Sequence, residues 1–488
     1  MNTDAASSKN PSTPTSHEAS PEAPPQAHKK AIHDHEFHPE DDIHSDRPSR
    51  SGWLWILAAS AMAWPWLFYR FTQDFHHGPP ALIALLSGIA ILGSAFILSW
   101  AAEAFQIDVS QALALALLSL IAVLPEYAVD AVFAWRAASD LPTCGQVGFD
   151  ACNAPYAIAN MTGANRLLIG VGWSSVVLLA WWRTRAGRSG QPIGGPADDP
   201  GEVVNGAVRF KKGQSLELAA LLLATLYSFI IPLKHVLGGQ NPLFRGVGPL
   251  DTVILVSLFA VYAWGTARAP AEDPHLVGPA ATIGALPTLQ RRLMTYGMFF
   301  YAAAVIFVSA EPFAEGLVTS GSTLGIDEFL LVQWVAPLAS ESPEFIVALL
   351  FAWRGAASAG LRTLVASKVN QWTLLIGTLG AVYSLASGQL IDLPLDTRQT
   401  EELFLTSAQS LFALALIANF DLSVRESLVL LGTFLAQLFF PQTEVRVGFA
   451  FFYLIAAIAM IALDKSRRQT ILALPAMVRE TVGLSAKS

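Results

Sequence analysis

Residues 327–354 form an apolar run long enough to cross a bilayer, yet Glu341 and Glu344 lie inside it. A charge at the centre of a membrane costs about 2.5–3.5 kcal/mol on insertion scales, so such residues usually face a polar cavity and mark an ion path. Pro337 and Pro343 remove two backbone donors from the same run. Freed carbonyls beside carboxylates predict an oxygen-rich site, which is what a hard cation needs.

The same pattern occurs earlier in the chain. Pro125–Arg136 aligns without a gap to Pro343–Arg354, and seven of the twelve positions are identical, which is a strong internal repeat. A second apolar segment with a polar cluster follows each copy, at 159–170 and at 366–377, and both segments end in Leu-Leu-Ile-Gly. The repeat relates Glu126 to Glu344, so we expect both carboxylates to reach the same depth from opposite sides.

Length and apolarity predict twelve membrane spans and an all-α polytopic membrane protein, which fits a chain with 53% hydrophobic and 14% charged residues. Spans two to six form one five-helix half, spans seven to eleven form the other, and one extra helix lies at each end. An odd number of spans per half makes the halves an inverted repeat, as in many secondary transporters. The predicted spans are 53–71, 80–104, 111–136, 155–182, 215–236, 251–268, 294–318, 327–354, 362–386, 402–420, 424–440 and 446–463.

The domain division follows these spans. It gives a disordered cytoplasmic tail over 1–50, an extra helix at 53–71, a first half over 80–268 with its repeat at 111–182, a cytoplasmic linker over 269–293, a second half over 294–440 with its repeat at 327–386, an extra helix at 446–463 and a cytoplasmic tail over 464–488. The histidines and acids of the first tail suit either a weak metal-sensing segment or a plain solvated arm. No basic run with interleaved aromatic residues points to nucleic acid.

Residues in the predicted loops indicate the orientation of the chain in the membrane and predict a disulfide. Basic residues gather after the fourth, sixth and twelfth spans, so the positive-inside rule predicts that both termini lie in the cytoplasm at the cell (inner) membrane. Cys144 and Cys152 are the only cysteines and share one loop on the opposite side, which favours a disulfide over two free thiols. Residues 203–210 carry an Asn-Gly turn signal and predict a small hairpin.

The paired segments resemble the two alpha-repeats of the calcium/cation antiporter superfamily, which includes the sodium/calcium exchangers. There the first repeat helix carries Gly-Thr-Ser-x-Pro-Glu, and the second carries Gly-Ser-Asn before an apolar run. The two Pro-Glu pairs match closely, whereas Ala122-Val-Leu and Ser340-Glu-Ser depart from the residues that precede them in the family. The resemblance covers roughly residues 80–440. It implies a membrane antiporter with cation ligands in both repeats.

The resemblance also implies a set of site residues. The expected ion-binding residues are Glu126, Glu344, Glu341, Ser340, Asn165 and Asn370, with Glu126 and Glu344 as the principal metal ligands. Glu341 is an added charge, because the family has serine or threonine there. Residues expected close to these, in a supporting shell, are Asp130, Thr162, Ser367, Lys368, Arg166 and Thr373.

Arg166 and Lys368 are unexpected beside a cation site. They can pair with Asp130 or Glu341 and leave net charge for one divalent ion, or they can snorkel towards an interface. A third possibility is that they exclude a divalent ion in favour of a monovalent one. The register is also open, because aligning Leu-Leu-Ile-Gly in place of the asparagines shifts the second repeat helices by two residues.

Together these features predict a secondary antiporter that exports Ca²⁺ by alternating access in exchange for H⁺ or Na⁺, with no cofactor. Ala122, Val123, Ala164 and Val369 replace sodium ligands of the sodium-driven relatives, which favours H⁺. The alternatives are a monovalent Na⁺/H⁺ exchanger on the same scaffold, a non-transporting membrane receptor and an intramembrane enzyme. Neither Gly-x-Ser-x-Gly nor His-Glu-x-x-His occurs, which argues against an enzyme. The expected partners are inorganic cations and the lipid bilayer, and the sequence does not set the oligomeric state.

Overall fold

The computed structural model describes most of the chain between residues 50 and 483. The described ranges are 50–72, 78–108, 124–139, 154–186, 206–209, 214–238, 241, 244–269, 276, 278–440 and 442–483. The expected disulfide between Cys144 and Cys152, the positions Ala122 and Val123 and the acidic tail lie outside these ranges. All of the described residues belong to one compact unit, Asp42–Ser488.

The first half of the molecule begins with the long helix α3 (Pro80–Phe105). It continues through α5 (Leu124–Ser139), α7 (Ala154–Leu167), the π-helical segment η4 (Leu168–Trp173), α8 (Ser174–Arg185), α9 (Ser215–Ser228), α10 (Ile230–Gly238) and α11 (Pro249–Arg268). α11 starts at a proline, whose missing N–H is not needed in a first turn. The Asp251 carboxylate accepts a hydrogen bond of 2.7 Å from the N–H of Gly248 at the same end.

The second half repeats this order. It contains α13 (Thr288–Leu324), α14 (Glu328–Arg354), α15 (Ala357–Asn370), the π-helical segment η6 (Gln371–Leu375), α16 (Ile376–Ser387), α17 (Thr397–Ile417) and α18 (Val424–Phe439). Local chemistry sets several of these ends. Asp327 accepts from the N–H of Leu330 where α14 starts, and Gly355 ends α14 with a φ of 95°, which glycine adopts without strain.

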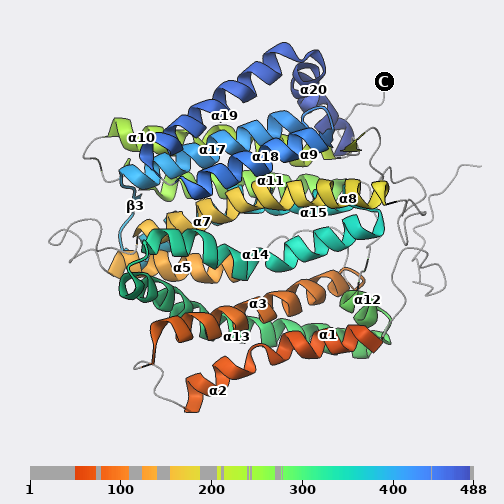
Figure 1. Ribbon diagram of the computed structural model, residues 1–488, viewed down its shortest axis with the longest axis vertical. Coiled ribbons are helices and arrows are strands. Elements are labelled where there is room, and N and C mark those ends of the chain that lie inside the picture. The colour runs from red at the N-terminus through yellow and green to blue at the C-terminus, as the bar shows by residue number, and fades with distance from the viewer. Residues whose placement is uncertain are drawn as a thin grey trace, which may run out of the picture. The chain divides into compact units, whose positions relative to one another are not determined.

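The two halves pack as an inverted repeat (Figure 1). α3 and α13 lie side by side and run in opposite directions. Ala84 near the start of α3 meets Gly316 near the end of α13, and Phe105 at the end of α3 makes an edge-to-face contact with Tyr296 near the start of α13, with ring centres 6.1 Å apart. α5 packs on α16 as α14 packs on α8, and α11 packs on η6 and α16 as α18 packs on η4 and α8. Sequence repeat and spatial repeat therefore coincide.

In the described part of the chain, four short strands connect the halves at the helix ends. β2 (Gly246–Val247) pairs antiparallel with β3 (Leu393–Pro394), and β1 (Ala207–Arg209) pairs antiparallel with β4 (Asp421–Ser423). The first strand of the hairpin predicted over residues 203–210 lies outside the described ranges, and the described strand β1 hydrogen-bonds to a strand of the other half. A three-residue strand gains more from a buried partner than from its own turn, since an isolated two-stranded hairpin is only marginally stable.

Within the described ranges, five helices lie outside the two halves. They are α1 (Arg50–Ala61), α2 (Trp64–Thr72), α12 (Pro279–Gly284), α19 (Thr443–Leu463) and α20 (Lys465–Thr481). The span predicted as one helix at 53–71 is broken at Met62 and Ala63, because Pro65 has no N–H to donate to Ala61. Most of the tail at 464–488 is the helix α20, which packs against α9 and α19.

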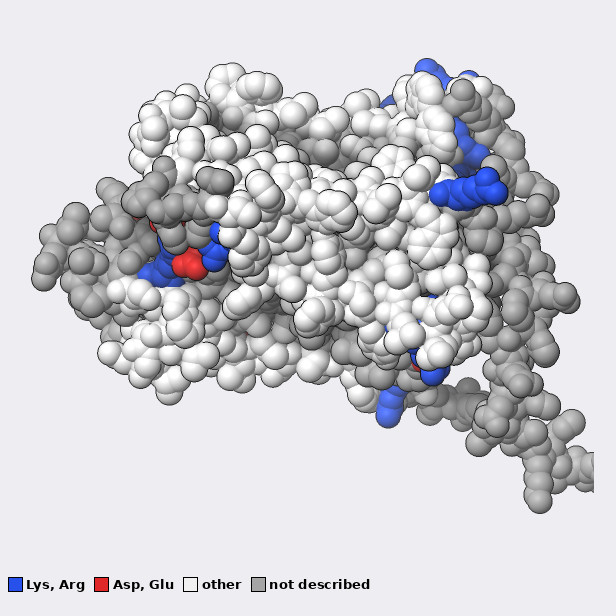
Figure 2. Space-filling view, turned by 90° about the horizontal axis from the view of Figure 1, so that it is seen from below, with Lys and Arg blue, Asp and Glu red and all other residues white. Residues whose placement is uncertain are grey.

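Seven described helical segments are long and apolar enough to cross a membrane: 80–105, 154–185, 215–238, 249–268, 288–324, 328–354 and 443–463. α17 is more polar, yet every residue from Leu405 to Ile417 is buried, so its polar groups do not face lipid. Figure 2 shows one face of the molecule on which charged side chains lie towards the two ends and uncharged ones fill the broad band between them. Phe300 and Phe307 of α13 are 79% and 83% exposed, as expected for lipid-facing residues.

Candidate cation site

α14 and α5 carry the acidic residues at the centre of the molecule. α14 stays helical through Pro337 and Pro343. The broken backbone that the sequence suggested at these prolines is therefore not present. Pro337 still deprives the carbonyl of Gln333 of its helical donor. That carbonyl faces Gly163 of α7, where a Cβ atom would lie only 1.8 Å from the oxygen. A glycine on one helix and a proline on the other thus bring the two backbones into contact.

Three glutamates meet between these helices. Carboxylate oxygens of Glu126, Glu341 and Glu344 all lie within 4.8 Å of one another, and all three side chains are buried. Glu126 comes from α5 of the first half, and the other two come from one face of α14 in the second half. In each carboxylate, Oε2 has no hydrogen-bond partner within the described part of the chain. Carboxylate oxygens that lie close together and lack a hydrogen-bond partner are suitable ligands for a hard cation.

Neighbouring side chains hold two of these carboxylates. Gln371, the first residue of η6, donates its amide to Oε1 of Glu341 and makes a second contact of 3.4 Å to the Ser367 hydroxyl. The Ser340 hydroxyl interacts with Glu126. Gln371 was not among the residues expected from the sequence. The only available signal was an amide one turn after Ser367 in an apolar helix.

The two expected asparagine ligands do not behave as a pair. Asn165 accepts a hydrogen bond of 2.6 Å on its amide oxygen from the ammonium of Lys368, and its amide donates to the carbonyl of Met161. Lys368 also lies 4.0 Å from the ring centre of Trp372 and close enough to Glu341 for a charge interaction. Asn370 is buried in the last turn of α15. The oxygen that Asn165 was expected to offer a cation is therefore occupied by a lysine.

The other polar residues are distributed around this centre. Asp130 accepts a hydrogen bond of 2.7 Å from Asn160, and not from Arg166 as one interpretation of the sequence had it. Arg166 forms a buried ion pair with Glu402 of α17. Thr162 and Thr373 donate their hydroxyl protons to carbonyls four residues earlier in their own helices, at 2.7 and 2.6 Å.

The packing also bears on the register of the second repeat helices. Gly170 lies against Phe434 of α18, and Gly377 lies against Leu255 and Val256 of α11. Because α18 and α11 are the equivalent fifth helices of their halves, these glycines occupy equivalent places. The alignment of Leu-Leu-Ile-Gly is therefore the structural one, and Asn165 and Asn370 are not counterparts.

An inverted repeat of membrane-length helices with three buried carboxylates at its centre defines the class of the protein: it is a secondary transporter for cations. The chain belongs to the sodium/calcium exchanger protein family, whose model matches residues 80–267 and 294–442. The resemblance noted from the two Pro-Glu motifs is thereby confirmed.

Solved structures agree with this assignment. The crystal structure of the H⁺/Ca²⁺ exchanger CAX is 40% identical in sequence, has a TM-score of 0.76, and matches over 89% of this chain and 100% of that chain. A structure of the Ca²⁺/H⁺ antiporter protein YfkE is 14% identical over 83% of this chain and 100% of that chain, with a TM-score of 0.54, and shows the fold alone. Among curated proteins, no sequence matches this chain.

Proposed function

We propose that this protein is a Ca²⁺/H⁺ antiporter that exports Ca²⁺ through the centre formed by Glu126, Glu341 and Glu344. The observation that carries the proposal is the convergence of three buried carboxylates, contributed by both halves, with an uncommitted oxygen on each. The relative that is 40% identical is described as an H⁺/Ca²⁺ exchanger, which supports the same pair of ions. Glu126 and Glu344 are the principal ligands in this proposal, and Ser340 and Asn370 contribute neutral oxygens.

Exchange follows from competition for the same oxygens. A carboxylate that holds a proton is a poor ligand for Ca²⁺, and a bound divalent ion excludes protons from the carboxylates it contacts. When the halves rock, a centre built from α5 on one side and α14 on the other opens to one face at a time. Each passage therefore carries either the metal or protons, which couples the two fluxes. The positive charge of Lys368 offsets part of the negative charge of the three glutamates.

The choice of H⁺ over Na⁺ rests on the neutral oxygens around the centre. Sodium needs several oxygens to replace its water, and Ala164 and Val369 offer none. Asn165 gives its oxygen to Lys368. A proton needs only a carboxylate. We also propose that the chain acts in the cell (inner) membrane, with both termini in the cytoplasm. In this proposal the protein uses no cofactor and catalyses no covalent reaction. Its domain boundaries are those expected from the sequence.

The test is ion flux through purified protein in liposomes, with Ca²⁺, Na⁺ and H⁺ gradients set independently. A pH gradient alone should drive Ca²⁺ uptake, and a sodium gradient alone should not. Glu344→Gln serves as the matched control for passive leak. Uptake that follows sodium and ignores pH would refute the choice of counter-ion. Na⁺/H⁺ exchange without any Ca²⁺ flux would replace the proposal with the monovalent exchanger, and substrate turnover without flux would replace it with an enzyme.

A further inference from the structure

Lys368, in the last turn of α15, places a positive charge beside the cation centre, and its side chain is fully buried. The ammonium donates a hydrogen bond of 2.6 Å to the amide oxygen of Asn165 and lies 4.0 Å from the ring centre of Trp372. Glu341 is close enough for a charge interaction. An amide oxygen, the face of an indole ring and a carboxylate all attract positive charge, so these groups together form the surroundings of a cation.

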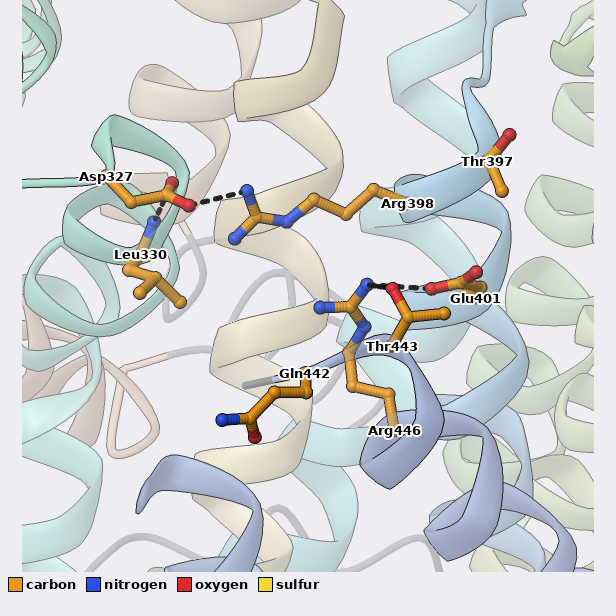
Figure 3. A pocket seen from close by; sticks show the side chains of 8 residues that line it. All are labelled: Asp327, Leu330, Thr397, Arg398, Glu401, Gln442, Thr443 and Arg446. Carbon is orange, nitrogen blue, oxygen red and sulfur yellow. Dashed lines mark hydrogen bonds and ion pairs between the residues drawn. The ribbon is translucent and has the colours of Figure 1, made fainter. Parts of the chain in front are cut away.

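The ammonium of Lys368 differs from other basic groups in having no direct acidic partner. Two arginines beside a surface pocket of about 460 Å³ show the usual arrangement, because Arg398 contacts Asp327 and Arg446 contacts Glu401, each at 2.7 Å (Figure 3). For Lys368, no carboxylate oxygen of a described residue lies within ion-pair distance. A buried charge without such a partner is costly, and an apolar side chain of the same length would fill the space. Packing alone therefore does not explain a lysine here.

The amide of Asn165 is oriented to receive a cation. Its nitrogen donates to the carbonyl of Met161 at 2.8 Å, which turns its oxygen towards Lys368. Nearby, the amide of Gln371 donates to Glu341, while its own oxygen is buried and has no hydrogen-bond partner in the described part of the chain. Carbonyl oxygens replace the hydration shell of small monovalent cations. The ammonium thus lies among ligands that suit such an ion.

The repeat supplies this positive charge in one half only. In the register set by Gly170 and Gly377, the counterpart of Lys368 is Met161, which carries no charge. A lysine that served only to hold equivalent helices together would be expected in both copies. The difference between the halves adds one positive charge beside the three glutamates.

We propose that the ammonium of Lys368 is a tethered cation, which fills a second cation subsite next to the Ca²⁺ centre. Asn165, Trp372 and Glu341 form this subsite. The inference rests on the proposed antiport. Three carboxylates carry one more negative charge than a single Ca²⁺ neutralises, and the ammonium supplies the missing positive charge without a second ion from solution. It thereby limits the centre to one Ca²⁺ and removes the need for sodium.

The test empties the subsite and refills it from solution. Lys368→Ala removes the outer carbons and the ammonium of the side chain, and n-propylammonium supplies the same groups. Thermal unfolding of the purified full-length variant in detergent is measured with n-propylammonium or Na⁺ and, at the same ionic strength, with the larger cation choline. Relative to choline, we expect both smaller cations to raise the unfolding temperature of Lys368→Ala by about 2 °C or more and to leave the wild type unchanged.

Matched variants and an uncharged probe separate charge from packing. Lys368→Met fills the space with an uncharged side chain and should not respond to either cation. Adding Asn165→Leu to Lys368→Ala removes the amide oxygen and should abolish the response. The alcohol n-propanol is close in size to n-propylammonium but has no charge, and it should have no effect.

Three results would overturn the subsite. They are equal unfolding temperatures of Lys368→Ala in n-propylammonium and choline, an equal response to n-propanol, and a response that persists after Asn165→Leu. A Lys368→Ala variant that folds in neither n-propylammonium nor Na⁺ would also overturn it, because the amine supplies the groups that the substitution removed.

Ca²⁺ binding to the same proteins separates this inference from the function on which it rests. Ligands at coupled sites change each other's affinity reciprocally. The Ca²⁺ affinity of Lys368→Ala should therefore differ about fivefold or more between choline and saturating Na⁺, whereas that of the wild type should not. Equal affinities in Lys368→Ala would refute the link between subsite and centre. If the wild type binds no Ca²⁺, the proposed antiport fails, and the response to n-propylammonium still decides whether a cation belongs beside Asn165.

Discussion

The close approach of α7 and α14 gives the most specific test of the centre. A Cβ atom on Gly163 would lie 1.8 Å from the carbonyl oxygen of Gln333 and 2.7 Å from its carbonyl carbon, and both belong to backbone. Ordinary contacts of this kind exceed 3.0 Å. Gly163→Ala must therefore push the helices apart by about 1 Å or more, at a cost of about 1–3 kcal/mol for overpacking.

That displacement acts on function through geometry. α7 carries Asn165, which holds Lys368 near Glu341, and α14 carries Glu341 and Glu344, so a shift of about 1 Å misplaces groups on both helices. A misplacement of this size can cost about 100-fold where geometry sets a rate. We expect Gly163→Ala to unfold at a lower temperature than the wild type and to lose at least about tenfold in Ca²⁺ flux.

The matched control is Gly432→Ala in α18, where a Cβ atom meets nothing within 4 Å. There alanine should leave flux unchanged and raise stability by up to about 1 kcal/mol, because glycine is a poor helix former. The assays are Ca²⁺ flux in liposomes and thermal unfolding of the purified variants in detergent. Wild-type flux and an unchanged unfolding temperature in Gly163→Ala would refute the contact between the two backbones.

Further predictions address the ligands, the loop cysteines and the effect of acid. Glu126→Gln and Glu344→Gln should each nearly abolish Ca²⁺ flux in protein that still purifies as a folded species, and normal flux in either would be hard to reconcile with this centre. Cys144 and Cys152 should resist thiol labelling in native membranes until a reductant is added; immediate labelling of both would disprove the disulfide. Asp108, beyond the end of α3, accepts hydrogen bonds from two arginines at the start of α13, which hold the pKa of its carboxyl below the usual value. Its contribution to stability is therefore present at neutral pH and lost as pH falls below about 4, so the advantage of wild type over Asp108→Asn in thermal unfolding should shrink in acid. A constant difference from pH 7 to pH 3 would contradict that pairing.

The sequence by itself determined the architecture. Runs of about 20 apolar residues must be helices in a bilayer, because only an internally hydrogen-bonded backbone is stable there. The gap-free repeat of Pro125–Arg136 and Pro343–Arg354 then required two copies, and an odd number of spans per copy required that they be inverted. Carboxylates at Glu126, Glu341 and Glu344, in runs that otherwise exclude charge, indicated where a cation pathway would lie.

Tertiary structure alone decided which polar groups meet. Arg166 and Glu402 are 236 residues apart, and Lys368 and Asn165 are 203 residues apart, so no local pattern links them. Which face of a helix points to which neighbour depends on its rotation about its axis, and residues one position apart point about 100° apart. Asn165 and Arg166 show this directly, because one turns to Lys368 and the other to Glu402.

The same reason explains the remaining differences from expectation. β1 pairs with β4 of the opposite half because the segment before α9 and the segment before α18 meet in space. A turn signal in the sequence carries no information about such a distant partner. Gln371 reaches Glu341 because α15, which leads into η6, packs against α14, and an amide in an apolar segment does not reveal which acid it will contact. The sequence thus determined which residues could not face lipid, and only the packing of distant helices determined what each of them faces instead.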